Sequence, residues 1–99
     1  MPFHGIYPAL LTPFDENDEV NETVLRDILD FQLWAGVQGF WVCGGMCEGL
    51  LLSAEERCRV AEIAVAQVDG RAKVIVHVGA MTTREAASLA RHAENIGAD

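Results

Sequence analysis

The residues with the clearest potential for chemistry form a glycine–cysteine corner at residues 43–48, within the stretch WVCGGMCEGLLLSAEER (41–57). Three apolar residues lead into this corner, and one carboxylate, Glu48, lies just beyond its glycine pair. Such a corner can be a ligand-binding turn or only a connection. Glu48 can act as a general acid or base if it lies in a closed pocket. Alternatively, it can accept backbone amides and stabilise the turn.

The other reactive side chains show no pattern of a metal site. Cys43, Cys47 and Cys58 are an odd number of cysteines without the spacing of zinc ligands, and no histidine lies near them in the sequence. We therefore expect no metal and reduced thiols, which are typical of a cytoplasmic protein. His77 lies within an apolar run, where a hydrogen-bonded core histidine is more common than a catalytic base.

The charge balance excludes several classes of partner. Fifteen acidic residues against seven basic ones give a formal net charge of −8. This charge argues against binding to nucleic acid or to an anionic membrane surface. No apolar run approaches the ~20 residues that a membrane-spanning helix needs.

The corner must be positioned by alternating strands and helices. Apolar runs predict strands at residues 6–11, 39–43 and 74–78. Amphipathic stretches predict a helix after each run, beginning after Asn21, Ser53 and Thr82, with capping boxes at the last two positions. This order predicts parallel strands with right-handed crossovers, in sequential order and with all helices on one face.

Three parallel strands leave two sheet edges unpaired, and the sequence stops where a fourth strand would begin. We therefore expect residues 1–99 to be the N-terminal fragment of a single, larger α/β domain. The inner strand face of such a fragment would be exposed, and we assign to it Ala9, Leu11, Val42 and Val76.

Four segments together resemble the N-terminal third of the dihydrodipicolinate synthase / N-acetylneuraminate lyase family. They are GIYPALLTPF (5–14), GVQGFWVCGGMCEG (36–49), LSAEER (52–57) and KVIVHVGAMTTREAASLARHAENIGAD (73–99). The resemblance implies a TIM (β/α)8 barrel, usually a homotetramer, whose chemistry lies at the C-terminal ends of the strands. It also implies a lyase that forms a Schiff base between a lysine and pyruvate or a related 2-keto acid. This lyase cleaves or condenses the keto acid with an aldehyde and needs no cofactor.

In the family, the loop after the second strand usually reads Gly-(Ser/Thr)-Thr-Gly-Glu and holds the carboxylate of the keto acid. Here Gly44 and Glu48 fit this pattern, whereas Gly45 and Met46 replace the two hydroxyl residues and Cys47 replaces the glycine. We expect the backbone N–H groups of Gly45 and Met46 to bind the carboxylate, with Gly44 beside them. Thr12, Cys47 and Glu48 are expected to support the loop.

The resemblance places the catalytic lysine and tyrosine of the family beyond Asp99, so we expect no catalytic residue within residues 1–99. The only lysine, Lys73, precedes the third strand and would face the N-terminal end of the barrel. We therefore expect the 99-residue chain to be inactive by itself. Two alternatives stay open: a 2-keto-3-deoxy sugar acid dehydratase of the same family, and a non-catalytic half-barrel that acts as a binding module.

Overall fold

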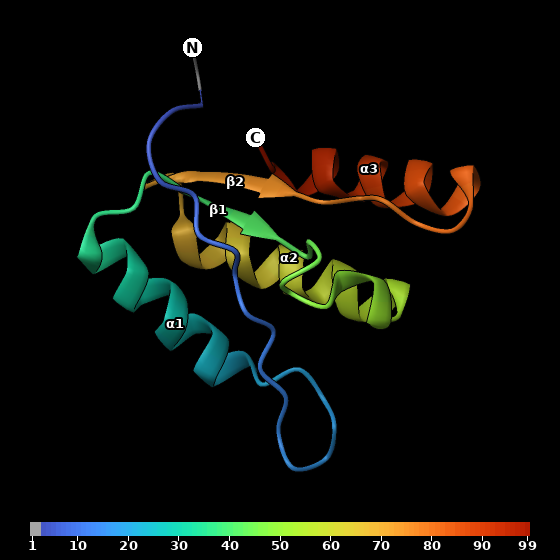
Figure 1. Cartoon of the computed structure of the whole chain (residues 1–99), viewed down its shortest axis with the longest axis horizontal. Coiled ribbons are helices and arrows are strands. Elements are labelled where there is room, and N and C mark those ends of the chain that lie inside the picture. Colours follow the sequence, from blue (N-terminus) through green and yellow to red (C-terminus); the bar gives the residue numbers. More distant parts are fainter. Residues whose placement is uncertain (1–2) are drawn as a thin grey trace.

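The computed structural model describes residues 3–99, which form three helices and a two-stranded sheet (Figure 1). The elements in chain order are α1 (Glu22–Ala35), β1 (Gly39–Val42), a 3-10 turn (Gly49–Leu51), α2 (Ala54–Val68), β2 (Lys73–Val76) and α3 (Thr83–Ile96). Among these residues, no helix combines the length and the apolar character needed to cross a membrane.

The helices begin where the capping residues predict. Asn21 accepts a hydrogen bond from the backbone N–H of Val24, and Ser53 forms a complete capping box with Glu56. The second predicted box is only half formed, because Thr82 accepts from the amide of Glu85 but no reciprocal bond is present in the described chain. Side-chain caps of this kind satisfy the amides that a helix leaves free at its first turn.

The sheet is parallel, with β1 and β2 in register from Gly39↔Lys73 to Val42↔Val76. The prediction of a regular strand at residues 6–11 is wrong, since this segment contributes only an isolated parallel bridge between Ala9 and Trp41. Pro8 has no N–H to donate and therefore interrupts a regular ladder. The segment still lies beside β1, where the amide of Leu10 donates to the carbonyl of Trp41, so the predicted sequential order is confirmed.

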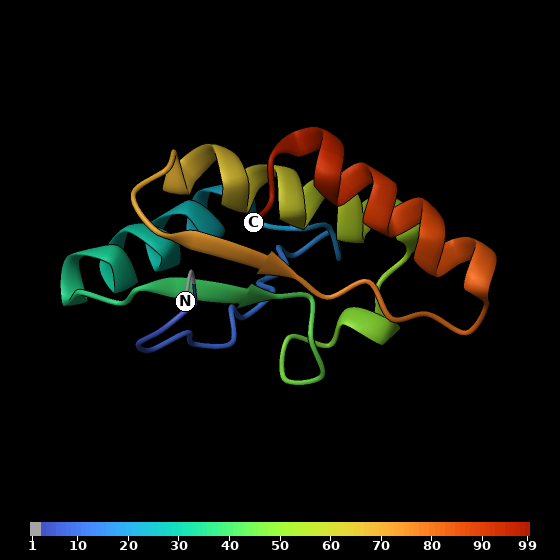
Figure 2. The same cartoon turned by 90° about the horizontal axis from the view of Figure 1, so that it is seen from above.

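All three helices lie on one face of the sheet, as predicted (Figure 2). Helix α2 packs between the other two and covers both strands. The core between the helices and the sheet consists mainly of aliphatic side chains and includes Leu25, Leu29, Phe40, Val42, Val60, Ala64, Val68 and Val74.

The opposite face of the sheet carries no helix (Figure 2). Trp41 alternates with the fully buried Phe40 and Val42, so its side chain lies on this open face, where it is 38% exposed. Leu11 is also exposed, as predicted. The assignment of Val42 and Val76 to the open face is wrong, because both contact the helix-side core. The reason is the alternation of side chains along each strand, whose register an unbroken apolar run does not reveal.

Candidate functional site

The corner follows the C-terminal end of β1, at the same end of the sheet as the segment that follows β2 (Figure 1). Its backbone leaves the strand at Cys43, which has a φ of 60°, and turns again at Glu48, with a φ of 59°. Both values lie in the left-handed region, which is uncommon for residues other than glycine. The surrounding contacts must therefore hold this shape.

Backbone hydrogen bonds inside the corner use the carbonyl groups of its two central glycines. The Gly44 oxygen accepts from the amides of Cys47 at 3.1 Å and Gly49 at 3.0 Å, and the Gly45 oxygen accepts from the amide of Glu48 at 3.1 Å. The amides of Gly45 and Met46 have no acceptor within residues 3–99. These two donors, on an exposed part of the corner, are thus free to bind an anion.

Close packing requires glycine at two positions, Gly44 within the corner and Gly49 directly after it. A Cβ on Gly49 would overlap the backbone carbonyl of Cys43, and a Cβ on Gly44 would overlap the indole of Trp41. By contrast, a Cβ on Gly45 would meet nothing within 4 Å. The exposed tip of the corner therefore has free space around it, whereas its base is tightly packed.

The structure brings Thr12 into the corner from the N-terminal segment. The hydroxyl group of Thr12 donates a 2.8 Å hydrogen bond to the carbonyl oxygen of Cys47. The Cys47 thiol in turn points back to the strand, with its sulfur 3.5 Å from the carbonyl oxygen of Trp41. Residues 35 positions apart in the sequence thus hold the same loop.

Glu48 does not have the arrangement that the sequence suggests. Its side chain is exposed and forms no hydrogen bond or ion pair within residues 3–99, so the expected contact with backbone amides is not formed. The backbone amides of Cys47, Glu48 and Gly49 donate instead to the carbonyl oxygens of Gly44 and Gly45. Met46 is 76% exposed at the tip.

The three cysteines are free thiols. Burial raises the pKa of the Cys43 thiol from 9.0 to about 11, although the nearby positive charge of Arg57 opposes this shift. Burial also raises the pKa values of Cys47 and Cys58. All three are therefore neutral at physiological pH, which does not favour a role as nucleophile or metal ligand. Within residues 3–99, no group of three or more His, Cys, Asp or Glu side chains could hold a metal ion.

Two further residues connect the corner to the segment after β2. His77 is half-buried just beyond β2, and its Nδ1 lies 3.2 Å from the carbonyl oxygen of Cys43. Arg57 on α2 is only 4% exposed and donates to the carbonyls of His77 and Gly79. The prediction that His77 is a hydrogen-bonded histidine is confirmed, whereas the role of Arg57 was not predicted from the sequence. The sequence signal for the burial of Arg57 was its helical spacing of three, four and seven residues from the buried Val60, Ala61 and Ala64.

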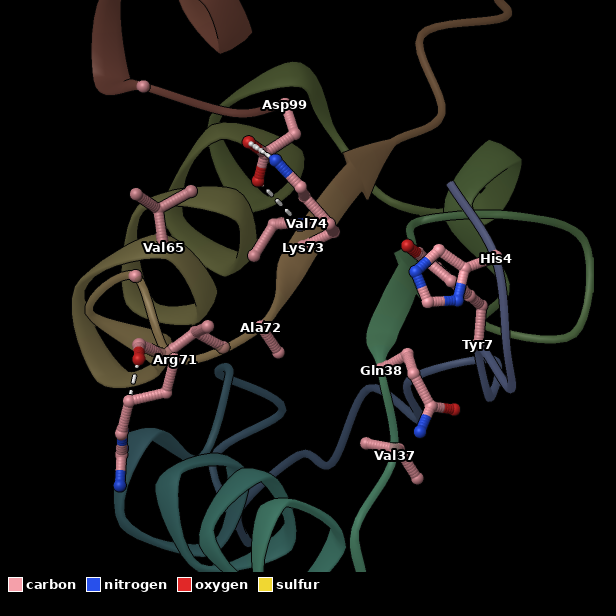
Figure 3. A pocket seen from close by; sticks show the side chains of 13 residues that line it. His4, Tyr7, Val37, Gln38, Val65, Arg71, Ala72, Lys73, Val74 and Asp99 are labelled. Atoms are coloured by element: carbon pink, nitrogen blue, oxygen red, sulfur yellow. Dashed lines mark hydrogen bonds and ion pairs between the residues drawn. The ribbon is translucent and has the colours of Figure 1, made fainter. Parts of the chain in front are cut away.

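Lys73 lies at the opposite end of the sheet, at the start of β2. It lines a cavity together with His4, Tyr7, Gln38 and Asp99 (Figure 3). Its Nζ is 3.3 Å from a carboxylate oxygen of Asp99, and both side chains are partly exposed. Lys73 is therefore remote from the corner, in agreement with its predicted position at the N-terminal end of the strands.

Comparisons with known proteins agree with this architecture. The family model of the dihydrodipicolinate synthetase family matches residues 2–99. Among curated proteins, the chain is 43% identical over 97 residues to a 4-hydroxy-tetrahydrodipicolinate synthase of Syntrophobacter fumaroxidans. It is 38% identical, also over 97 residues, to an N-acetylneuraminate lyase of Rhizobium meliloti. These alignments cover 98% of this chain but only 33% and 32% of the two relatives, so the chain spans about a third of their length.

Solved structures show the same relationship. A prophage protein of the dihydrodipicolinic acid synthase family from Escherichia coli K12, in complex with pyruvate, superposes with a TM-score of 0.95 at 34% identity. Dihydrodipicolinate synthase from Aquifex aeolicus superposes with a TM-score of 0.93 at 40% identity. Each match covers 98% of this chain and 33% of the other. They confirm the predicted fold, the N-terminal part of a (β/α)8 barrel, and the chain belongs to the dihydrodipicolinate synthetase family.

Proposed function

We propose that the protein containing this chain is a Schiff-base-forming keto-acid lyase, and that residues 43–48 form its carboxylate-binding loop. The observation that carries this proposal is the pair of free amides at Gly45 and Met46. They lie at the C-terminal end of β1, the end at which (β/α)8 barrels place their chemistry. Family membership supports the class of reaction.

The two amides would replace the side-chain hydroxyls that the family loop usually provides. A hydrogen bond to a charged group contributes about 1.5–3 kcal/mol. Two backbone donors can therefore orient a 2-keto acid without any side chain at these positions. The bond from Thr12 to the Cys47 carbonyl would keep the loop in place while the ligand binds and leaves.

The Schiff-base lysine would come from another part of the barrel. Lys73 does not fit this role, because it lies at the start of β2, at the opposite end of the sheet from the corner, where it pairs with Asp99. A lysine nucleophile requires an environment that lowers its pKa. The family resemblance likewise suggests an aldehyde as second substrate and a homotetramer. The free thiols support a cytoplasmic location.

The test is borohydride trapping with pyruvate, read by intact mass measurement. We expect no adduct on the 99-residue polypeptide and one adduct per subunit on the full-length protein. Borohydride alone and pyruvate alone serve as controls. A stoichiometric adduct on Lys73 would overturn the assignment of its role. Absence of an adduct on the full-length protein would contradict the proposed reaction and favour a non-catalytic binding module.

A further inference from the structure

Arg57 is a buried cation beside the corner. No carboxylate within residues 3–99 forms an ion pair with it. Its two terminal nitrogens donate to the carbonyl oxygens of His77 and Gly79, each at 2.7 Å, and its buried Nε has no hydrogen-bond partner in the described chain. An arginine stays protonated in proteins, and burying its charge without a counterion is unfavourable. A function that uses this charge would explain why it is present.

The Arg57 contacts reach the corner through His77. The backbone amide of His77 donates to the carbonyl of Val42 at 2.8 Å, and its Nδ1 faces the carbonyl oxygen of Cys43. A carbonyl oxygen can only accept, so Nδ1 must carry a proton in this contact. His77 thus holds the peptide group that follows the left-handed Cys43, at the entry to the amide pair.

The His77 ring itself is closely confined. Its centroid lies 6.0 Å from that of Trp41. A Cβ on Gly79 would come within 2.8 Å of the ring, so a side chain at this position would displace the imidazole. Arg57 holds the carbonyls of both residue 77 and residue 79, and therefore sets the backbone on which the ring is mounted.

We infer that Arg57 is a positioning residue of the carboxylate-binding corner, acting through His77, and that its unpaired charge favours an anion at the Gly45 and Met46 amides. The inference rests on the proposed function and adds Arg57 and His77 to the residues that form the carboxylate-binding site. A second contact supports the link: the Cys43 thiol lies 3.9 Å from the backbone carbonyl oxygen of Arg57.

The test uses the full-length protein with pyruvate as the probe. The concentration of pyruvate that half-saturates borohydride trapping is measured for Arg57→Met, Arg57→Lys, His77→Phe and His77→Asn, together with kcat and the thermal midpoint. Arg59→Met is the matched control, because Arg59 lies on the same helix, is exposed and pairs with Glu22 at the surface.

We expect Arg57→Met to raise the half-saturating concentration about tenfold or more, which corresponds to the loss of one charge-assisted contact. Arg57→Lys retains the charge but loses the bidentate contact with the carbonyls of residues 77 and 79. Its half-saturating concentration should lie between those of Arg57→Met and the wild type. His77→Asn retains a donor near the Nδ1 position and should bind pyruvate better than His77→Phe. Arg59→Met should leave the value unchanged.

Coupling between the two residues is the decisive measurement. If Arg57 acts through His77, the double variant Arg57→Lys/His77→Phe should be less impaired than the product of the two single effects predicts. Multiplicative effects, or a lower thermal midpoint without any change in half-saturation, would overturn the inference.

If Arg57→Met does not fold, Arg57→Lys and the two His77 variants decide the question. If the wild-type protein forms no pyruvate adduct, the proposed function fails, and the inference fails with it. An adduct with unchanged affinity in every variant refutes the inference alone.

Discussion

Replacing Gly49 with alanine should disturb the corner strongly although it adds only one methyl group. The new Cβ would overlap the backbone carbonyl of Cys43. That carbonyl cannot turn aside easily, because it also accepts from His77 and belongs to a residue in the left-handed region. Forcing extra atoms into a packed site typically destabilises a protein by about 1–3 kcal/mol. The backbone of the corner must shift to relieve the overlap, so the Gly45 and Met46 amides would be displaced as well.

The same corner supplies a matched control. Alanine at Gly45 adds an identical methyl group with nothing within 4 Å of it, and surface changes of this kind usually alter stability by no more than about 0.5 kcal/mol. In the full-length protein we expect Gly49→Ala to lower the thermal midpoint by several degrees, on the scale of roughly 2–4 °C per kcal/mol. It should also raise the half-saturating pyruvate concentration. Equal midpoints and equal affinities for Gly49→Ala and Gly45→Ala would refute this reasoning.

Three further changes test separate contacts of the corner. Thr12→Val removes the donor to the Cys47 carbonyl at nearly constant volume. It should destabilise the protein by ~1 kcal/mol, as measured by chemical denaturation. It should also weaken pyruvate binding, as measured by borohydride trapping. Substituting threonine at both Gly45 and Met46 introduces two hydroxyls and should change the Michaelis constant for keto acids several-fold; an unchanged constant for every keto acid tried would count against a carboxylate site. The third change is in pH. Because the folded-state pKa of Cys43 is about 11 against 9.0 for an ordinary thiol, the neutral thiol stabilises the fold fully below pH 9.0, and this contribution is lost as the pH rises toward 11. Thermal midpoints should therefore fall across that interval in the wild type and fall less in Cys43→Ala.

The helices of this protein could be predicted well from the sequence. Their boundaries depend on local chemistry: side-chain caps at Asn21 and Ser53, and glycines in the left-handed conformation at Gly36 and Gly97. These interactions lie within a few residues of one another, so the sequence itself reveals them. The position of the corner after the second apolar run was predictable for the same reason.

The first strand and the faces of the sheet were less accessible. An apolar run indicates burial but does not show which residues point toward the helices, and here Val42 and Trp41 point in opposite directions. The segment 6–11 has the composition of a strand. Its regular pairing is nevertheless limited to the bridge between Ala9 and Trp41, because Pro8 cannot donate.

The sequence by itself determined the alternation of strands and helices, the caps, and the glycine-rich turn with its chemical potential, because each depends on neighbouring residues. Only the tertiary structure decided which groups surround that turn. The contacts from Thr12 to Cys47, from His77 to Cys43 and from Arg57 to the loop after β2 join residues 20 to 35 positions apart. Parallel strands with helical crossovers place the C-terminal ends of successive strands side by side, and this juxtaposition of distant segments brings those side chains to one end of the sheet.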